Sequence, residues 1–100
     1  MKTTIAQWSS IYSIDPKQAR RLIKLAEKRN KFAVNVCNGE SHPSMPGVTD
    51  KNALAHRWEA DCNEVEAELE AVAKEVGWLV EYPALYPHFI SEGRTIYLPG

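Results

Sequence analysis

The chain has 100 residues, of which 44% are hydrophobic and 25% are charged, and its net charge is −1. This length and composition are typical of one globular domain, here residues 1–100, and exclude a collagen-like, coiled-coil-only or disordered chain. No run approaches the ~20 apolar residues that cross a bilayer, and the first residues lack the apolar segment of a signal peptide, so we expect a cytoplasmic protein. Two cysteines are too few for a disulfide framework.

Charge is divided unevenly along the chain. Residues 1–36 contain eight Lys and Arg and two acidic residues, which gives this part a charge of +6. Residues 37–100 contain four Lys and Arg and eleven acidic residues, which gives −7. Because summed charge steers encounters over about a Debye length, this asymmetry is compatible with contact to nucleic acid or to a basic protein groove. Equally, two lobes of opposite sign can simply attract each other.

Two helix starts are visible in the first part of the chain. Thr4 is followed three residues later by Gln7, the spacing of a capping box, and this predicts a helix over about 5–12. Asp15 and Pro16 combine an N-cap acid with a proline at the first helical position. They predict a second helix over about 16–37, which the Asn-Gly pair at 38–39 ends.

Residues 40–49 contain two prolines and a glycine and are predicted to form a loop. A third helix is predicted over about 50–76, because apolar residues recur there at steps of three and four until Gly77 ends the pattern. These residues are Leu54, Trp58, Cys62, Val65, Leu69, Val72 and Val76.

The last part of the chain has the composition of β-strands. Residues 78–82 and 95–98 are rich in β-branched and aromatic side chains, and residues 91–93 form a turn signal before the second run. We predict that the two runs pair with each other, with a loop at 84–86 and with Trp78, Tyr82 and Ile96 in the core. The predicted fold class is therefore α+β: three helices followed by a small C-terminal antiparallel β-hairpin.

Residue types used in catalysis are present, but not in a catalytic pattern. His56 and Cys62 lie six residues apart on one predicted helix, about 120° off a shared face, and no Cys-x-x-Cys pair exists to seed a zinc site. Nothing adjacent to Cys37 and His42 suggests an oriented base. The acids at 64, 66, 68 and 70 are spread around their helix, which is usual for a solvated face but also allows imitation of phosphate charge. We predict no enzyme, no metal and no cofactor.

Residues 5–23 resemble a helix-turn-helix unit. In this resemblance Ser9 sits where the two helices touch, Ser13 takes the turn position usually occupied by glycine, and Ile14 is the buried turn residue. The second helix then offers polar side chains to phosphates and base edges. The candidate binding residues on it are Lys17, Gln18, Arg20, Arg21, Lys24 and Lys28.

Several short segments resemble the small accessory reading frames of bacteriophage genomes. These segments are 37–40, 57–63, 77–78 and 82–89, with Gly93, Leu98 and Pro99. Among phage products the chain is similar in style to anti-CRISPR proteins, which inhibit by stoichiometric binding. The resemblance implies a non-enzymatic inhibitor in the host cytoplasm that binds a type I CRISPR-Cas complex, of the Cascade or Csy kind, and blocks its binding of target DNA.

A protein without reactive groups has to act through an interface. Rigid aromatic side chains anchor interfaces well, so Tyr86 and Phe89 are added to the candidate partner-binding residues. The expected partner is a host protein or ribonucleoprotein complex, with no membrane and no small-molecule substrate. The alternative function is a helix-turn-helix transcriptional regulator that binds DNA. Whether the basic or the acidic face makes contact, and the oligomeric state, stay open.

Overall fold

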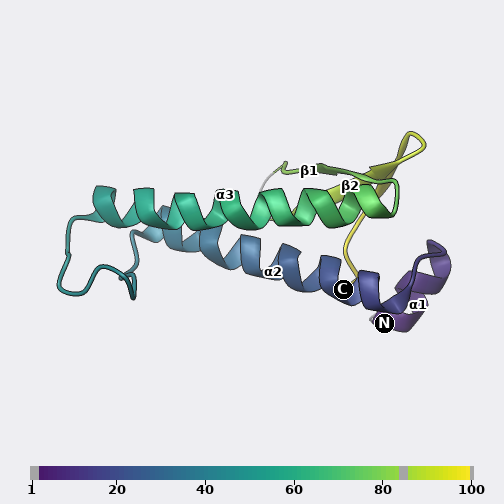
Figure 1. Ribbon diagram of the computed structural model, residues 1–100, viewed down its shortest axis with the longest axis horizontal. Coiled ribbons are helices and arrows are strands. Elements are labelled where there is room, and N and C mark those ends of the chain that lie inside the picture. The colour runs from purple at the N-terminus through teal and green to yellow at the C-terminus, as the bar shows by residue number, and fades with distance from the viewer. Residues whose placement is uncertain (1–2, 84–85, 100) are drawn as a thin grey trace.

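Two long antiparallel helices form the body of the molecule. The structure is a computed structural model that describes residues 3–83 and 86–99. Its elements are α1 (Ile5–Ile11), α2 (Pro16–Asn38), α3 (Lys51–Glu75), β1 (Leu79–Glu81), β2 (His88–Ser91) and β3 (Arg94–Ile96). α2 and α3 lie side by side along the long axis of a molecule that measures 47 × 26 × 22 Å, and α1 and the sheet gather at the end of this helix pair opposite the loop at 40–49 (Figure 1).

The caps that the sequence predicts start the helices. Thr4 Oγ1 accepts from the Gln7 amide at 3.1 Å, and the Thr4 amide donates to Gln7 Oε1 at 2.9 Å. The Asp15 carboxylate accepts from the Lys17 amide at 2.7 Å. Gly39 ends α2 in the left-handed conformation, and a Cβ there would meet Lys51 Cβ at 2.8 Å, so the start of α3 approaches closely only because this residue is glycine.

The turn between α1 and α2 has a left-handed residue at Ser13, with φ of 55°. This is the backbone conformation for which glycine is usually used, and serine adopts it here. The turn is closed by the Ile14 amide, which donates to the Ser9 carbonyl at 3.0 Å. Ser9 is buried, and its hydroxyl donates to the Ala6 carbonyl. These contacts fix the orientation of α1 relative to α2.

The apolar residues that recur at the predicted steps form the contact between α2 and α3. The buried side chains of α3 are Leu54, Trp58, Cys62, Val65, Leu69, Val72 and Ala73. Those of α2 are Ala19, Leu22, Ile23, Leu25 and Ala26. An ion pair from Arg29 Nε to Glu66 Oε2, 2.8 Å long, crosses between the helices. The three predicted helices, with ends within about one residue, are confirmed.

The sheet has one strand more than the predicted hairpin. β2 lies in the middle and pairs antiparallel with both β1 and β3, so the predicted direct pairing of 78–82 with 95–98 is wrong. β2 takes the middle position because its side chain Phe89 faces the core between two apolar partners. Phe89 is paired in register with Val80 of β1 and with Ile96 of β3. Of the predicted loop at 84–86, residues 84 and 85 lie outside the described residues.

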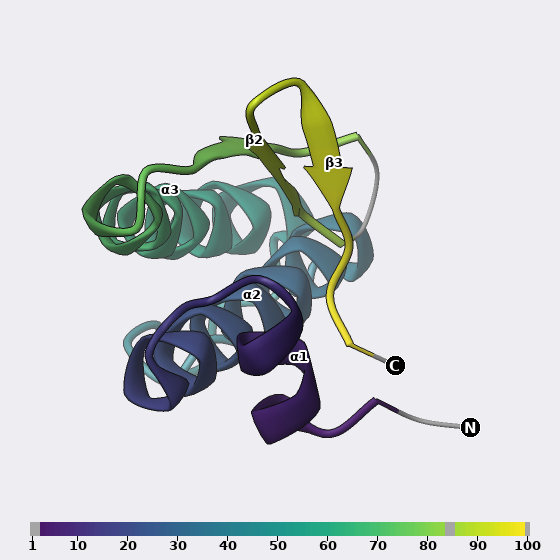
Figure 2. The same cartoon turned by 90° about the vertical axis from the view of Figure 1, so that its right-hand side faces the viewer.

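An aromatic cluster fastens α1 to the sheet. The ring centroids of Trp8 and Trp78 are 5.7 Å apart, and those of Trp78 and Phe89 are 5.4 Å apart. Trp8 Nε1 donates to the Tyr97 carbonyl at 2.8 Å. This bond joins α1 to the segment that follows β3, and Figure 2 shows these two parts of the chain on the same side of the molecule. Trp78 and Ile96 are buried as predicted, and Tyr82 is half-buried.

Replacing Phe89 by alanine should remove the centre of this cluster. Phe89 is fully buried, so Phe89→Ala should lower the free energy of unfolding by about 3–5 kcal/mol. Leu79→Ala, in the neighbouring strand at a side chain that is 71% exposed, should change it by about 0.5 kcal/mol or less. Urea unfolding followed by circular dichroism measures both, and equal losses would contradict the assigned core.

Candidate functional site

The exposed face of α2 is a stripe of positive charge. At 3.6 residues per turn the exposed basic side chains project opposite the buried ones. We call them the basic stripe: Lys17, Arg20, Arg21, Lys24, Lys28 and Lys31. At ~1.5 Å per residue the stripe is about 21 Å long. It contains no acidic residue, and Glu27 borders it on one side.

The structure brings five predicted binding residues, Lys28 among them, together on this stripe. Lys17, Arg20, Arg21 and Lys24 are exposed, and none of them makes an ion pair with a residue in 3–83 or 86–99. Their charges are therefore available to a polyanion. Gln18 does not join them, because its side-chain amide points toward α3 and donates to Glu75 Oε2 at 3.2 Å.

Lys28 lies on the side of the stripe that faces α3. It lines a cleft of about 260 Å³ together with Phe32 and three acidic side chains, those of Asp61, Glu64 and Glu68. Its ammonium group lies 5.8 Å from the centroid of the Phe32 ring. The field of these carboxylates opposes that of Lys28, so this side of the stripe attracts an anion less than the side that faces the sheet.

The two predicted aromatic anchors differ in exposure. Tyr86 is 58% exposed and is available to a partner. Phe89 has no exposed surface, and its prediction as a binding residue is wrong. Alternation along β2 turns Phe89 toward Trp8 and Trp78, and a side chain buried there cannot reach a partner.

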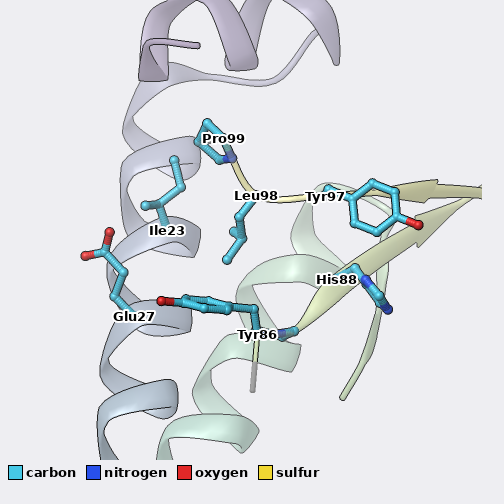
Figure 3. A pocket seen from close by; sticks show the side chains of 8 residues that line it. Ile23, Glu27, Tyr86, His88, Tyr97, Leu98 and Pro99 are labelled. Atoms are coloured by element: carbon cyan, nitrogen blue, oxygen red, sulfur yellow. The ribbon is translucent and has the colours of Figure 1, made fainter. Parts of the chain in front are cut away.

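A cavity of about 440 Å³ lies between α2 and the chain on either side of the sheet (Figure 3). The residues that line it are Ile23, Glu27, Tyr86, Pro87, His88, Tyr97, Leu98 and Pro99. The Tyr86 ring lies across one end with its hydroxyl directed toward Glu27, while Ile23 and Leu98 form an apolar wall. The sequence does not predict this cavity, because its walls come from segments about 60 residues apart.

A second polar cluster holds the loop at 40–49 against α3. His42 is 8% exposed, and its Nε2 lies 2.6 Å from Asp61 Oδ2. Its Nδ1 accepts from the Ser44 amide at 3.0 Å and lies 2.7 Å from Ser44 Oγ. Arg57 completes the cluster, with Nη2 at 3.3 Å from Asp61 Oδ1 and Nε donating to Ser44 Oγ at 3.2 Å.

This cluster contains a serine, a histidine and a carboxylate in series, as in a hydrolase, but the histidine is engaged in holding the loop. An imidazole Nδ1 has one lone pair, and the backbone amide of Ser44 already donates to it. A general base needs that lone pair for the proton of the nucleophile. The neighbouring bond from Trp58 Nε1 to the Glu40 carbonyl, 3.0 Å long, fastens the same loop. No local pattern in the sequence marks this pairing, since Asp61 is 19 residues from His42.

The thiol of Cys62 and the hydroxyl of Tyr82 are held in their neutral forms. Burial, and after it the Glu66 carboxylate, raises the pKa of the Cys62 thiol above its ordinary value. Burial, and after it the carboxylates of Glu70 and Glu66, raises the pKa of the Tyr82 hydroxyl strongly. In the described part of the chain, no group of three or more His, Cys, Asp and Glu side chains is placed to hold a metal ion.

The two cysteines should therefore differ in reactivity. Cys37 is exposed and Cys62 is buried. Because the pKa of Cys62 is raised, a smaller fraction of its thiol is ionised at mildly alkaline pH than in a cysteine with the ordinary pKa. Iodoacetamide should alkylate Cys37 first and Cys62 only after the protein is unfolded in urea. Peptide mass spectrometry at successive times measures the order. Equal rates at both sites in the folded protein would contradict the placement of Cys62.

Removing the carboxylate of Asp61 should loosen the loop at 40–49. Asp61→Ala leaves the buried His42 Nε2 without its partner, and should lower the free energy of unfolding by about 1–3 kcal/mol. Glu59→Ala, at an exposed position two residues away on α3, is the matched control and should change it by about 0.5 kcal/mol or less. Thermal unfolding of the two variants makes the comparison, and a neutral Asp61→Ala would show that the cluster does not hold the loop.

No known protein family, curated protein or solved structure matches this chain. In residues 3–83 and 86–99 there is no helix of the length and apolar character that a membrane span requires.

Proposed function

We propose that this protein acts by binding nucleic acid through the basic stripe of α2. The observation that carries the proposal is the alignment of six exposed Lys and Arg side chains along one face of one rigid helix. Duplex DNA carries about one negative charge per 1.7 Å of its axis, so a stripe about 21 Å long faces several phosphates at once. Neutralising them releases counterions, which is the main driving force of non-specific binding.

The hairpin of α1 and α2 supports this assignment. In a helix-turn-helix protein the first residues of the second helix reach base edges, while the preceding helix lies across the backbone. Here Lys17, Arg20 and Arg21 occupy the first turns of α2, directly after the left-handed turn at Ser13. Trp8 anchors α1 in the aromatic cluster, so α1 can brace α2 against a ligand.

The distribution of acidic groups indicates the direction of approach. Glu64 and Glu68 stand beside Lys28 on the α3 side and repel phosphates. On the sheet side, Arg20, Lys24 and Lys31 lie on the part of the stripe next to Glu27, which lines the cavity. We expect the nucleic-acid backbone to follow the stripe on its sheet side.

Charge neutralisation on the stripe tests the proposal. Arg20→Gln with Lys24→Gln should weaken binding of labelled duplex DNA and reduce the slope of log K against log salt concentration by about 0.9 for each phosphate that is no longer neutralised. Lys74→Gln, at an exposed lysine in the last turn of α3, is the matched control and should leave the slope unchanged. Fluorescence anisotropy over a salt series measures the slopes. An unchanged slope in the double variant would overturn the proposal.

A second candidate function is supported by the acidic side of α3. Glu64 and Glu68, one helical turn apart beside Asp61, form a negative border that could occupy a basic nucleic-acid groove of another protein. This is the action proposed for an anti-CRISPR-like inhibitor of a type I CRISPR-Cas complex in the host cytoplasm. Co-purification with such a complex, abolished by Glu64→Gln with Glu68→Gln and retained by Arg20→Gln with Lys24→Gln, would favour this function over direct DNA binding.

A further inference from the structure

Glu27 is an exception on an otherwise basic helix. It is the single acidic residue of α2, and Lys24 and Lys31 lie one turn away on either side of it. Nevertheless it makes no ion pair or hydrogen bond with any residue in the described ranges. A carboxylate at the border of a phosphate-binding stripe weakens the attraction of phosphates, so Glu27 is suited instead to a ligand group that donates hydrogen bonds.

The surroundings of Glu27 are suited to a flat, largely apolar group. Glu27 lines the 440 Å³ cavity on its α2 side, and this volume is in the range of small-ligand sites. The exposed Tyr86 ring forms one broad wall, and Ile23 and Leu98 form the other (Figure 3). Nucleobases stack on such rings in single-stranded nucleic-acid sites.

The cavity lies next to the basic stripe rather than on a separate face. Ile23 and Glu27 project from the side of α2 that adjoins Arg20, Lys24 and Lys31. A strand whose phosphates follow these three side chains therefore passes the mouth of the cavity. A base of that strand that is not paired can turn into it, whereas a base held in a duplex cannot.

From this arrangement we infer that the cavity binds one unpaired guanine base of a nucleic-acid strand held by the basic stripe, an inference that rests on the proposed function. A carboxylate offers two acceptor oxygens side by side. The Watson–Crick edge of guanine presents two adjacent donors, N1–H and the N2 amino group, which match them. Glu27 accepts both hydrogen bonds while the base stacks on Tyr86.

The other bases fit the carboxylate less well. Adenine and cytosine each present one amino donor beside a ring nitrogen that is an acceptor, and this acceptor faces a carboxylate oxygen unfavourably. Thymine and uracil present one N–H donor between two carbonyl acceptors. A pair of hydrogen bonds from the correct base discriminates against the wrong one by about tenfold or more. Glu27 is therefore the residue that sets the base preference.

The test uses the full chain and labelled oligothymidine strands with one central guanine, adenine or hypoxanthine. Hypoxanthine keeps N1–H and lacks the amino group, so it should bind with intermediate affinity. Fluorescence anisotropy should show about tenfold tighter binding of the guanine strand than of the adenine strand. The same series with a ribose backbone shows whether the strand is DNA or RNA, and a guanine preference in either one supports the inference.

Two variants locate the preference in the cavity. Glu27→Gln replaces one acceptor by a donor and removes a negative charge, so it should abolish the guanine preference while binding plain oligothymidine as tightly as the wild type or more tightly. Glu59→Gln makes the same chemical change at an exposed position on α3 and should retain the preference. Tyr86→Ala should lose affinity for the guanine strand and Tyr86→Phe should keep it, because the ring does the stacking.

The outcomes separate this inference from the function on which it rests. If the wild type binds all strands with equal affinity and a steep salt dependence, the basic stripe binds nucleic acid and the guanine site is wrong. If Glu27→Gln keeps the guanine preference, Glu27 does not read the base and the inference is likewise overturned. If the wild type binds duplex DNA but none of these single strands at low salt, the inference alone fails. If it binds neither, the proposed function and the inference both fail.

Discussion

The contact of Trp8 with Trp78 and Phe89 determines how the rest of this molecule is arranged. The two long helices could pair without it, since their apolar faces are complementary along most of their length. α1 has seven residues and is too short to be stable alone, and a three-stranded sheet of such short strands needs a helix to cover it. The aromatic cluster stabilises both elements, because Trp8 of α1 packs against Trp78, which packs against Phe89 of the sheet. It thereby places the hairpin of α1 and α2 and the walls of the cavity at one end of the molecule.

The helices can be predicted from the sequence because their determinants are local. The capping box at Thr4 and the Asp15-Pro16 start act within four residues, and the apolar steps of α3 repeat along the whole helix, so each signal is contained in the segment it describes. The basic stripe follows from the same periodicity, since all of its residues except Lys31 are predicted from their position on α2. Gln18 departs from it because its partner, Glu75, lies on another helix.

The sheet and the cavity depend on partners that are distant in the chain. β2 has only Phe89 and Ile90 between a histidine and a serine, and Pro87 precedes it, so its composition alone does not mark a strand. It forms a strand because Phe89 pairs in register with Val80 and Ile96, and the three side chains cover the core together. For the same reason the sequence does not show which C-terminal aromatic side chain is accessible. Tyr86 precedes β2 and is exposed, whereas the register of β2 turns Phe89, three residues later, into the core.

The hydrogen bond from Trp8 to the Tyr97 carbonyl closes a loop of 89 residues. α2 and α3 are neighbours in sequence, joined by a short connection, so their association carries a small loop-closure entropy and should form early during folding. Joining the N-terminal tryptophan to the last strand should come last. A chain in which this step has not yet occurred already exposes the basic stripe but lacks the cavity beside it. The proposed selectivity for a base would then require the complete fold, whereas the positive charge along α2 would not.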